Sequence, residues 1–170
     1  AISLHLELPG AWFEDAFGPT RHHSQWHIKR FVEPNDNTVW LPTHTDPSLI
    51  SIVVHDRPGK SAGSAGLQYY KDGNEWAYLP CSGHSVAVLF VGSVLQHCTA
   101  GYFRACRHRV VYDDHTTARQ RMAATLFVRP APTAVLLLPP SQRLSGRSIK
   151  SKLTFQQWNG RTARNYEKSK

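Results

Sequence analysis

Hydrophobic residues recur along this chain in short segments that turn residues separate. From about residue 25 to residue 130 the segments are rich in β-branched and aromatic residues: QWHIKRFVEP, TVWLPTHTD, SLISIVVHD, GLQYYKDGNEWAYLP, SVAVLFVGSVLQHCT, CRHRVVYDD and MAATLFVRP. Runs of this kind predict strands. Asp72-Gly73 lies between two apolar stretches and is typical of a hairpin turn. About seven short strands at regular spacing favour a sandwich, jelly roll or barrel.

The two ends of the chain follow a different pattern. Before residue 17, apolar residues are interrupted by Pro9-Gly10, which predicts a helix end, a turn and a short helix from about Ala11. At the other end, LTFQQWNGRTARNYEKSK spaces its few apolar residues among polar ones. This spacing predicts a C-terminal helix over about residues 152–168. We therefore expect a mainly β fold with flanking N- and C-terminal helices, in a single domain over residues 1–170.

Composition narrows the classes of function. The formal charge of +8 invites a nucleic-acid role, but much of the excess lies after position 140, and the other basic residues form no aromatic-interleaved platform. We expect no nucleic-acid partner. No apolar run reaches the ~18 residues that span a bilayer, so we expect no membrane partner. The three cysteines form no C-x-x-C pair, which favours a reduced, cytoplasmic setting and small apolar core residues.

His44 and Asp46 stand two apart at the end of a predicted strand. Alternate side chains of a strand share one face, so an imidazole and a carboxylate at this spacing can reach one ion. His108, at the start of another predicted strand, could complete the set from a facing strand. Two imidazoles and one carboxylate leave adjacent positions open on an octahedral ion, which suits iron(II) oxygenases. Zinc hydrolysis is the competing interpretation, although it needs an added general base.

Arg121 begins the last predicted strand, in RQRMAATLFVRP. An arginine that points into a barrel is costly unless an anion awaits it, and its planar fork suits a carboxylate. An exposed strand arginine is the alternative interpretation.

The ordered series HTDPSLISIVVHD, GLQYYKDGNEWAYLP, VAVLFVGSVLQHCTAGYFRACRHRVV and RMAATLFVRP resembles a known family over about residues 26–130. It is similar to the iron(II)- and 2-oxoglutarate-dependent dioxygenases of the isopenicillin N synthase-like group, and LTFQQW resembles their C-terminal helix. The likeness implies a double-stranded β-helix, or jelly roll. The family's N-terminal region finds no counterpart here and is expected to be missing.

Carried over by the resemblance, His44, Asp46 and His108 would hold iron and form the catalytic centre. Arg121 would bind the distal carboxylate of 2-oxoglutarate, with Arg119 as the fallback. The family usually has serine where Ala123 stands, and a tyrosine-rich strand where this chain has HIKRFVEP with Phe31. Losing one hydrogen bond costs about 0.5–1.5 kcal/mol, which would weaken cosubstrate binding without abolishing it.

The resemblance implies an oxidoreductase that uses iron(II), 2-oxoglutarate and O2 to hydroxylate or desaturate a small organic substrate. A second hypothesis is a non-catalytic binding module of the same fold, motivated by Ala123, the missing tyrosine and the missing N-terminal region. A third is a zinc-dependent or cupin-like hydrolase or isomerase. Binding of iron and 2-oxoglutarate, with or without succinate formation, separates the three.

Overall fold

The computed structural model describes eight segments of the chain: residues 1–18, 23–32, 39–55, 66–71, 75–79, 87–112, 120–150 and 152–168. Their helices and strands are α1 (Ile2–His5), α2 (Trp12–Phe17), β1 (Gln25–Val32), β2 (Val39–His44), β3 (Ile50–His55), β4 (Leu67–Lys71), β5 (Glu75–Tyr78), β6 (Ala87–Val91), α3 (Ser93–Cys98), β7 (His108–Val111), β8 (Gln120–Val128), a 3-10 turn (Gln142–Leu144) and α4 (Phe155–Lys168). None of these helices is long and apolar enough to cross a membrane.

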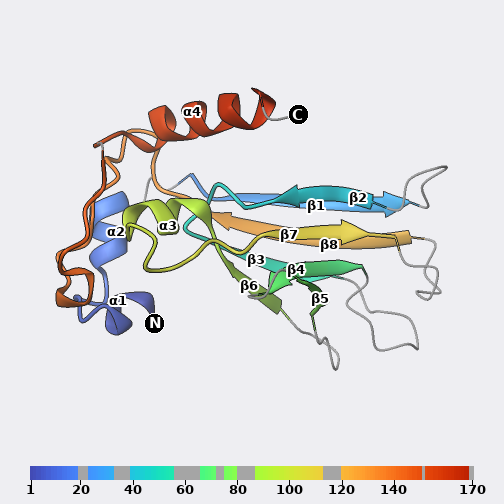
Figure 1. Ribbon diagram of the computed structural model, residues 1–170, viewed down its shortest axis with the longest axis horizontal. Helices are drawn as coiled ribbons and strands as arrows, with labels where there is room; N and C mark the ends of the chain where they lie inside the picture. Colours follow the sequence, from blue (N-terminus) through green and yellow to red (C-terminus); the bar gives the residue numbers. More distant parts are fainter. Residues whose placement is uncertain are drawn as a thin grey trace.

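The strands form two four-stranded antiparallel sheets (Figure 1). Sheet A has the order β1-β8-β3-β6, and sheet B has the order β2-β7-β4-β5. The chain passes back and forth between the sheets, so that neighbouring strands come from distant parts of the sequence. This arrangement confirms the predicted jelly roll. The predicted hairpin is confirmed by the antiparallel pairing of β4 with β5, while Asp72-Gly73 lies outside the described residues.

Three hydrophobic clusters form among the described residues, and two of them hold the sheets and helices together. One fills the space between the sheets and contains Phe31, Val53, Leu67, Phe90, Val110 and Ala123. The other lies at one end of the sheets, where α2 and α3 meet the start of α4 through Phe17, Leu95, Phe155 and Trp158. Figure 1 shows α1, α2 and α3 gathered at this end. The helices thus close one end of the sheet pair, and burial of their apolar side chains stabilises that closure.

The segment SVAVLFVGSVLQHCT is not a single β-rich unit, as its composition predicted. It is a strand, β6, that ends before Gly92, followed by the helix α3. A Cβ atom at position 92 would clash with the backbone carbonyl of Ser48, so glycine is needed where the chain turns. Val94, Leu95 and Cys98 of α3 are buried in the end cluster. Tertiary packing therefore overrides the β propensity of this short apolar run.

In strand β1, the face that looks apolar in the sequence is the outward face. Trp26 and Ile28 are 60% and 72% exposed on the outer face of sheet A, whereas Phe31 is buried between the sheets. Because alternate residues share a face, His27 and Lys29 point inward together with Phe31. β1 is an edge strand of the described part of sheet A, and its inward face therefore borders an opening rather than a closed core.

Candidate metal centre and cosubstrate pocket

The structure brings His44, Asp46 and His108 together near the helical end of the two sheets. His44 is the last residue of β2, Asp46 lies in the turn that follows, and His108 is the first residue of β7. One ligand atom from each lies within 4.8 Å of the others. The sequence suggested that His108 comes from a facing strand, and this prediction is wrong. It lies on the neighbouring strand of the same sheet, directly paired with His44.

The turn that carries Asp46 is held by the start of α3. The backbone N–H and the side-chain hydroxyl of Ser93 both donate to the carbonyl oxygen of Asp46, each at 2.8 Å. The N–H of Val94 donates to the carbonyl of Ser48 at 3.1 Å, and that of Gly92 donates to Leu49 at 2.9 Å. Four hydrogen bonds therefore fix the backbone around Asp46, and the carboxylate has little freedom to leave the two imidazoles.

Backbone carbonyls set the tautomer of both histidines. Nδ1 of His44 lies 2.7 Å from the carbonyl oxygen of Pro42, and Nδ1 of His108 lies 3.1 Å from that of Cys106. A carbonyl can only accept, so each Nδ1 carries the proton and donates. The lone pair of each neutral ring is then on Nε2, the atom that faces Asp46. A second hydrogen bond of this type is the usual support of a metal-binding histidine.

Burial and the neighbouring charges have opposite effects on the pKa values of Asp46 and His108. Burial acts to raise the pKa of Asp46, but the hydrogen bond and the positive charge that the neighbouring His44 and His108 offer when they are protonated outweigh it and hold that pKa below its ordinary value. Burial lowers the pKa of His108, and His44 adds to this effect while Asp46 opposes it. His108 also stacks on Phe90 with ring centroids 4.6 Å apart. The cluster therefore favours an ionised Asp46 carboxylate, and burial favours the neutral form of His108, which are the forms that bind a cation.

The arrangement fits a divalent metal ion. Oδ1 of Asp46 lies 3.5 Å from Nε2 of His44 and 3.7 Å from Nε2 of His108. Ligand atoms about 2.1 Å from a shared ion lie about 3.0–3.4 Å apart, so small side-chain movements would suffice. Oδ2 of Asp46 is buried and has no hydrogen-bond partner among the described residues. A buried carboxylate oxygen without a hydrogen-bond partner, beside two imidazole rings, favours the binding of a cation at this point.

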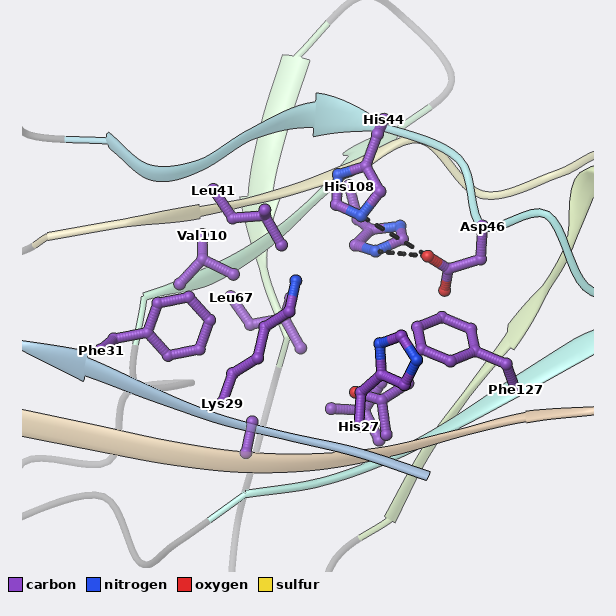
Figure 2. Close-up of a pocket in the computed structure, with 13 residues that line it drawn as sticks. His27, Lys29, Phe31, Leu41, His44, Asp46, Leu67, His108, Val110 and Phe127 are labelled. Atoms are coloured by element: carbon purple, nitrogen blue, oxygen red, sulfur yellow. Dashed lines mark ion pairs between the residues drawn. The ribbon is translucent and has the colours of Figure 1, made fainter. Parts of the chain in front are cut away.

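A pocket between the two sheets opens from this cluster (Figure 2). His44, Asp46 and His108 line one end of it, and His44 is the most exposed of the three at 24%. The rest of the lining comes mainly from β1 and β8, namely His27, Lys29, Phe31, Ala123, Thr125 and Phe127, with Leu41, Val53, Leu67 and Val110 from other strands. A ligand bound at the metal would therefore lie against the inner face of sheet A.

Two of the predicted cosubstrate residues, Arg121 and Ala123, lie in β8. Ala123 is buried, lines the pocket and pairs across the strands with Lys29. Its methyl group can contact a ligand but cannot hydrogen-bond to it. Arg121 lies two residues further from the metal cluster and its backbone pairs with Phe31, while its side chain is outside the described part of the chain. Arg119 is also outside the described residues.

The sequence reasoning missed His27 and Lys29 as pocket residues. The sequence carried a signal for both residues. They precede Phe31 by an even number of positions in one strand, so they share its face, and the resemblance sets Phe31 against the family's tyrosine-rich strand. The hydrophobic pattern pointed the other way, since Trp26 and Ile28 look like the core-facing residues of this strand. The pairing of Lys29 with Ala123 decides the direction, since directly opposed residues of an antiparallel pair lie on the same face.

Comparison with known families agrees with this geometry. The model of the 2OG-Fe(II) oxygenase superfamily matches residues 22–130, which is most of the chain and includes all three members of the cluster. The chain belongs to the 2OG-Fe(II) oxygenase superfamily. Members of this superfamily depend on iron(II) and 2-oxoglutarate, and the matched residues include a candidate metal-binding group at the end of a pocket.

Curated relatives are plant dioxygenases. Flavanone 3-dioxygenase 2 of Oryza sativa subsp. japonica is 31% identical over 130 residues, covering 76% of this chain and 35% of the relative. Gibberellin 2-beta-dioxygenase of Phaseolus coccineus is 32% identical over 112 residues, covering 66% of this chain and 31% of the relative. The chain thus spans about a third of the length of these relatives.

Solved structures share the fold over nearly the whole chain. JOX2 in complex with 2OG, Fe and JA matches with a TM-score of 0.74 at 21% identity, covering 93% of this chain and 45% of JOX2. The dioxygenase for auxin oxidation in rice matches with a TM-score of 0.75 at 19% identity, covering 96% of this chain and 52% of that one. At these identities the likeness establishes the jelly roll alone.

Proposed function

We propose that this chain is the catalytic core of an iron(II)- and 2-oxoglutarate-dependent dioxygenase that hydroxylates or desaturates a small organic molecule. One observation carries the proposal: His44, Asp46 and His108 converge at the end of a pocket, with both Nε2 lone pairs directed at a buried, ionised carboxylate. Family membership supports iron(II) over zinc for this ligand set.

Each residue has a distinct task in this mechanism. His44, Asp46 and His108 would hold the iron on one side and leave adjacent positions free for a cosubstrate and O2. When bound, iron(II) supplies the redox chemistry that couples O2 reduction to substrate oxidation. The balanced hydroxylation is 2-oxoglutarate + O2 + R–H → succinate + CO2 + R–OH. Asp46 contributes one negative charge and keeps the metal end of the pocket electrostatically suited to a cation.

The pocket wall orients the organic ligands. Phe31, Leu67 and Val110 provide an apolar surface between the sheets that restricts water. We propose that Arg121 binds the distal carboxylate of 2-oxoglutarate from β8, where bidentate hydrogen bonds would fix the length of the bound keto acid. The relatives named above, a flavanone 3-dioxygenase and a gibberellin 2-beta-dioxygenase, support a small organic molecule as the substrate class.

The test is an anaerobic titration of the metal-free protein with iron(II) and then 2-oxoglutarate, followed by admission of O2. We expect a weak visible absorption band that needs both additions, because a keto acid must chelate the bound metal to produce it. Succinate should then form in equal amount to the CO2 released. Iron binding without that band, or the band without succinate after O2, would contradict the proposal.

A further inference from the structure

Arg129, the residue directly after β8, is a half-buried cation that has no part in the mechanism above. It continues the inward alternation of Ala123, Thr125 and Phe127, all of which line the metal pocket. Its guanidinium lies over the Phe127 ring, with 5.1 Å between the guanidinium carbon and the ring centre. Arg129 therefore stands one step beyond Phe127, at the end of β8 opposite to Arg121.

The guanidinium is held in place but its charge is not paired. Nη1 donates to Oε1 of Gln25 at 2.9 Å, and Nε is buried without a hydrogen-bond partner among the described residues. No described residue forms an ion pair with Arg129. Burial lowers the pKa of Arg129 below its ordinary value, while the charge of Asp46 acts in the opposite direction. A metal ion on Asp46 would take up that compensating charge, so the guanidinium then favours another anion.

The neighbouring wall is apolar and aromatic. The His27 ring meets the Phe127 ring edge to face, with centroids 5.0 Å apart, and Figure 2 shows both rings across the pocket from Asp46. On its other side, Arg129 borders a cavity of about 140 Å³. The apolar residues that line this cavity are Phe13, Phe17, Leu49 and Val128. A ligand with one anionic group and an apolar body matches these surroundings.

We propose that Arg129 binds a carboxylate of the organic substrate, which makes the substrate an organic acid with an apolar body. This inference rests on the proposed function and names its substrate class. The planar guanidinium suits a carboxylate, and the bond to Gln25 fixes its orientation. A carboxylate held there places the adjoining carbon atoms against Phe127, on the wall that faces the metal cluster. The substrate and the 2-oxoglutarate held by Arg121 would thus be anchored at opposite ends of β8.

A purely structural role for Arg129 is the alternative. Its side chain bonds to Gln25 and its backbone N–H donates to Oγ of Ser24 at 3.4 Å, so it joins the end of β8 to the start of β1. Glu14 also lines the neighbouring cavity, although it is exposed and forms no ion pair with Arg129 among the described contacts. A structural role affects stability but places no requirement on the charge of a ligand.

The experiment titrates two probes into the anaerobic complex of the protein with iron(II) and 2-oxoglutarate. The probes are 3-phenylpropanoate and its uncharged amide, 3-phenylpropanamide, and their affinities are measured by calorimetry. Wild-type protein should bind the acid at least about tenfold more tightly than the amide, as expected for hydrogen bonds between charged groups. Arg129→Met should reduce this preference to within about twofold. Its iron(II) affinity should not fall, because the substitution removes a positive charge near a cation site.

Arg147→Met is the matched control. Arg147 also lies over an aromatic ring, that of Tyr102 at 5.3 Å, and its Nη1 donates to the carbonyl of Ala100 at 2.9 Å, but it lines neither the metal pocket nor the cavity. It should keep the wild-type preference for the acid. Arg129→Lys is the second variant, because it keeps the charge for the fold and loses the planar fork. Its preference should be intermediate, and thermal unfolding shows whether each variant is folded.

The outcomes separate the inference from the proposed function. Wild-type protein that forms the visible band with iron(II) and 2-oxoglutarate but binds acid and amide equally would overturn the inference alone. A folded Arg129→Met or Arg129→Lys protein with the full wild-type preference would also overturn it, and a lower unfolding temperature in that protein would make Arg129 a structural link between β1 and β8. Wild-type protein that forms no such band would overturn both.

Discussion

The two halves of the pocket are built in opposite ways. At the metal end, backbone hydrogen bonds fix His44, Asp46 and His108, and two of the three side chains are almost fully buried. At the end proposed for the cosubstrate, Ala123 offers no polar side-chain group, and Lys29 is a flexible, exposed cation. The first half is positioned before any ligand arrives, whereas the second depends on charge and on side-chain ordering.

This difference predicts how each half responds to change. A preorganised ligand set loses little entropy on binding, so its affinity depends on keeping every donor. Ordering a flexible, exposed lysine costs rotamer entropy, so individual polar groups at the other end should have moderate effects. Substitutions at the metal end should therefore act on metal affinity, and substitutions at the other end on the keto acid alone.

The largest expected effect is that of Asp46→Asn. It removes the single negative charge of the ligand set while keeping its size, and iron(II) affinity should fall at least about a hundredfold. The unfolding temperature of the metal-free protein at neutral pH should also fall, because the pKa of Asp46 is held below its ordinary value and the ionised carboxylate therefore stabilises the folded state. Anaerobic calorimetry and thermal unfolding measure the two quantities.

His23→Ala is the control for that experiment, since His23 is exposed and outside the cluster. It should leave iron affinity unchanged. Equal iron affinity in Asp46→Asn and wild-type protein would remove Asp46 from the ligand set.

A smaller effect is expected for Ala123→Ser. A hydroxyl on this inward position would lie beside Lys29 and could hydrogen-bond to the bound keto acid. The affinity for 2-oxoglutarate should rise about two- to tenfold, corresponding to about 0.5–1.5 kcal/mol, with iron affinity unchanged. Ala124→Ser, one residue along β8 and on its other face, provides the control. A gain of the same size in both variants, or in neither, would show that the pocket face of β8 does not contact the cosubstrate.

The smallest expected effect concerns the packing behind the metal end. Burial raises the pKa of Cys98, in α3, to about 12. The raised pKa keeps this thiol protonated at pH 8, and iodoacetamide reacts with the thiolate. Iodoacetamide should leave Cys98 unmodified at pH 8 in native protein, as read by peptide mass spectrometry. Rapid modification would show that α3 opens, and the support of the Asp46 turn with it.

The sequence predicted a large part of this architecture. The jelly roll, the β4–β5 hairpin and the terminal helices follow from local patterns that the structure bears out. α3 was missed because six residues are too few to show a helical period, and a short apolar run is read equally well as a strand. Its helical state depends on Gly92 and on contacts with the Asp46 turn, which are distant in sequence.

By itself, the sequence determined which residues could bind a metal. His44 and Asp46 lie two apart at a strand end, and His108 begins another strand, so local geometry and the order of motifs were sufficient to choose these candidates. Only the tertiary structure decided that His44 and His108 are neighbours in one sheet and that β1 turns Lys29 inward. The physical reason is register: strand alternation defines two faces, but only pairing with β8 selects which face lines the pocket.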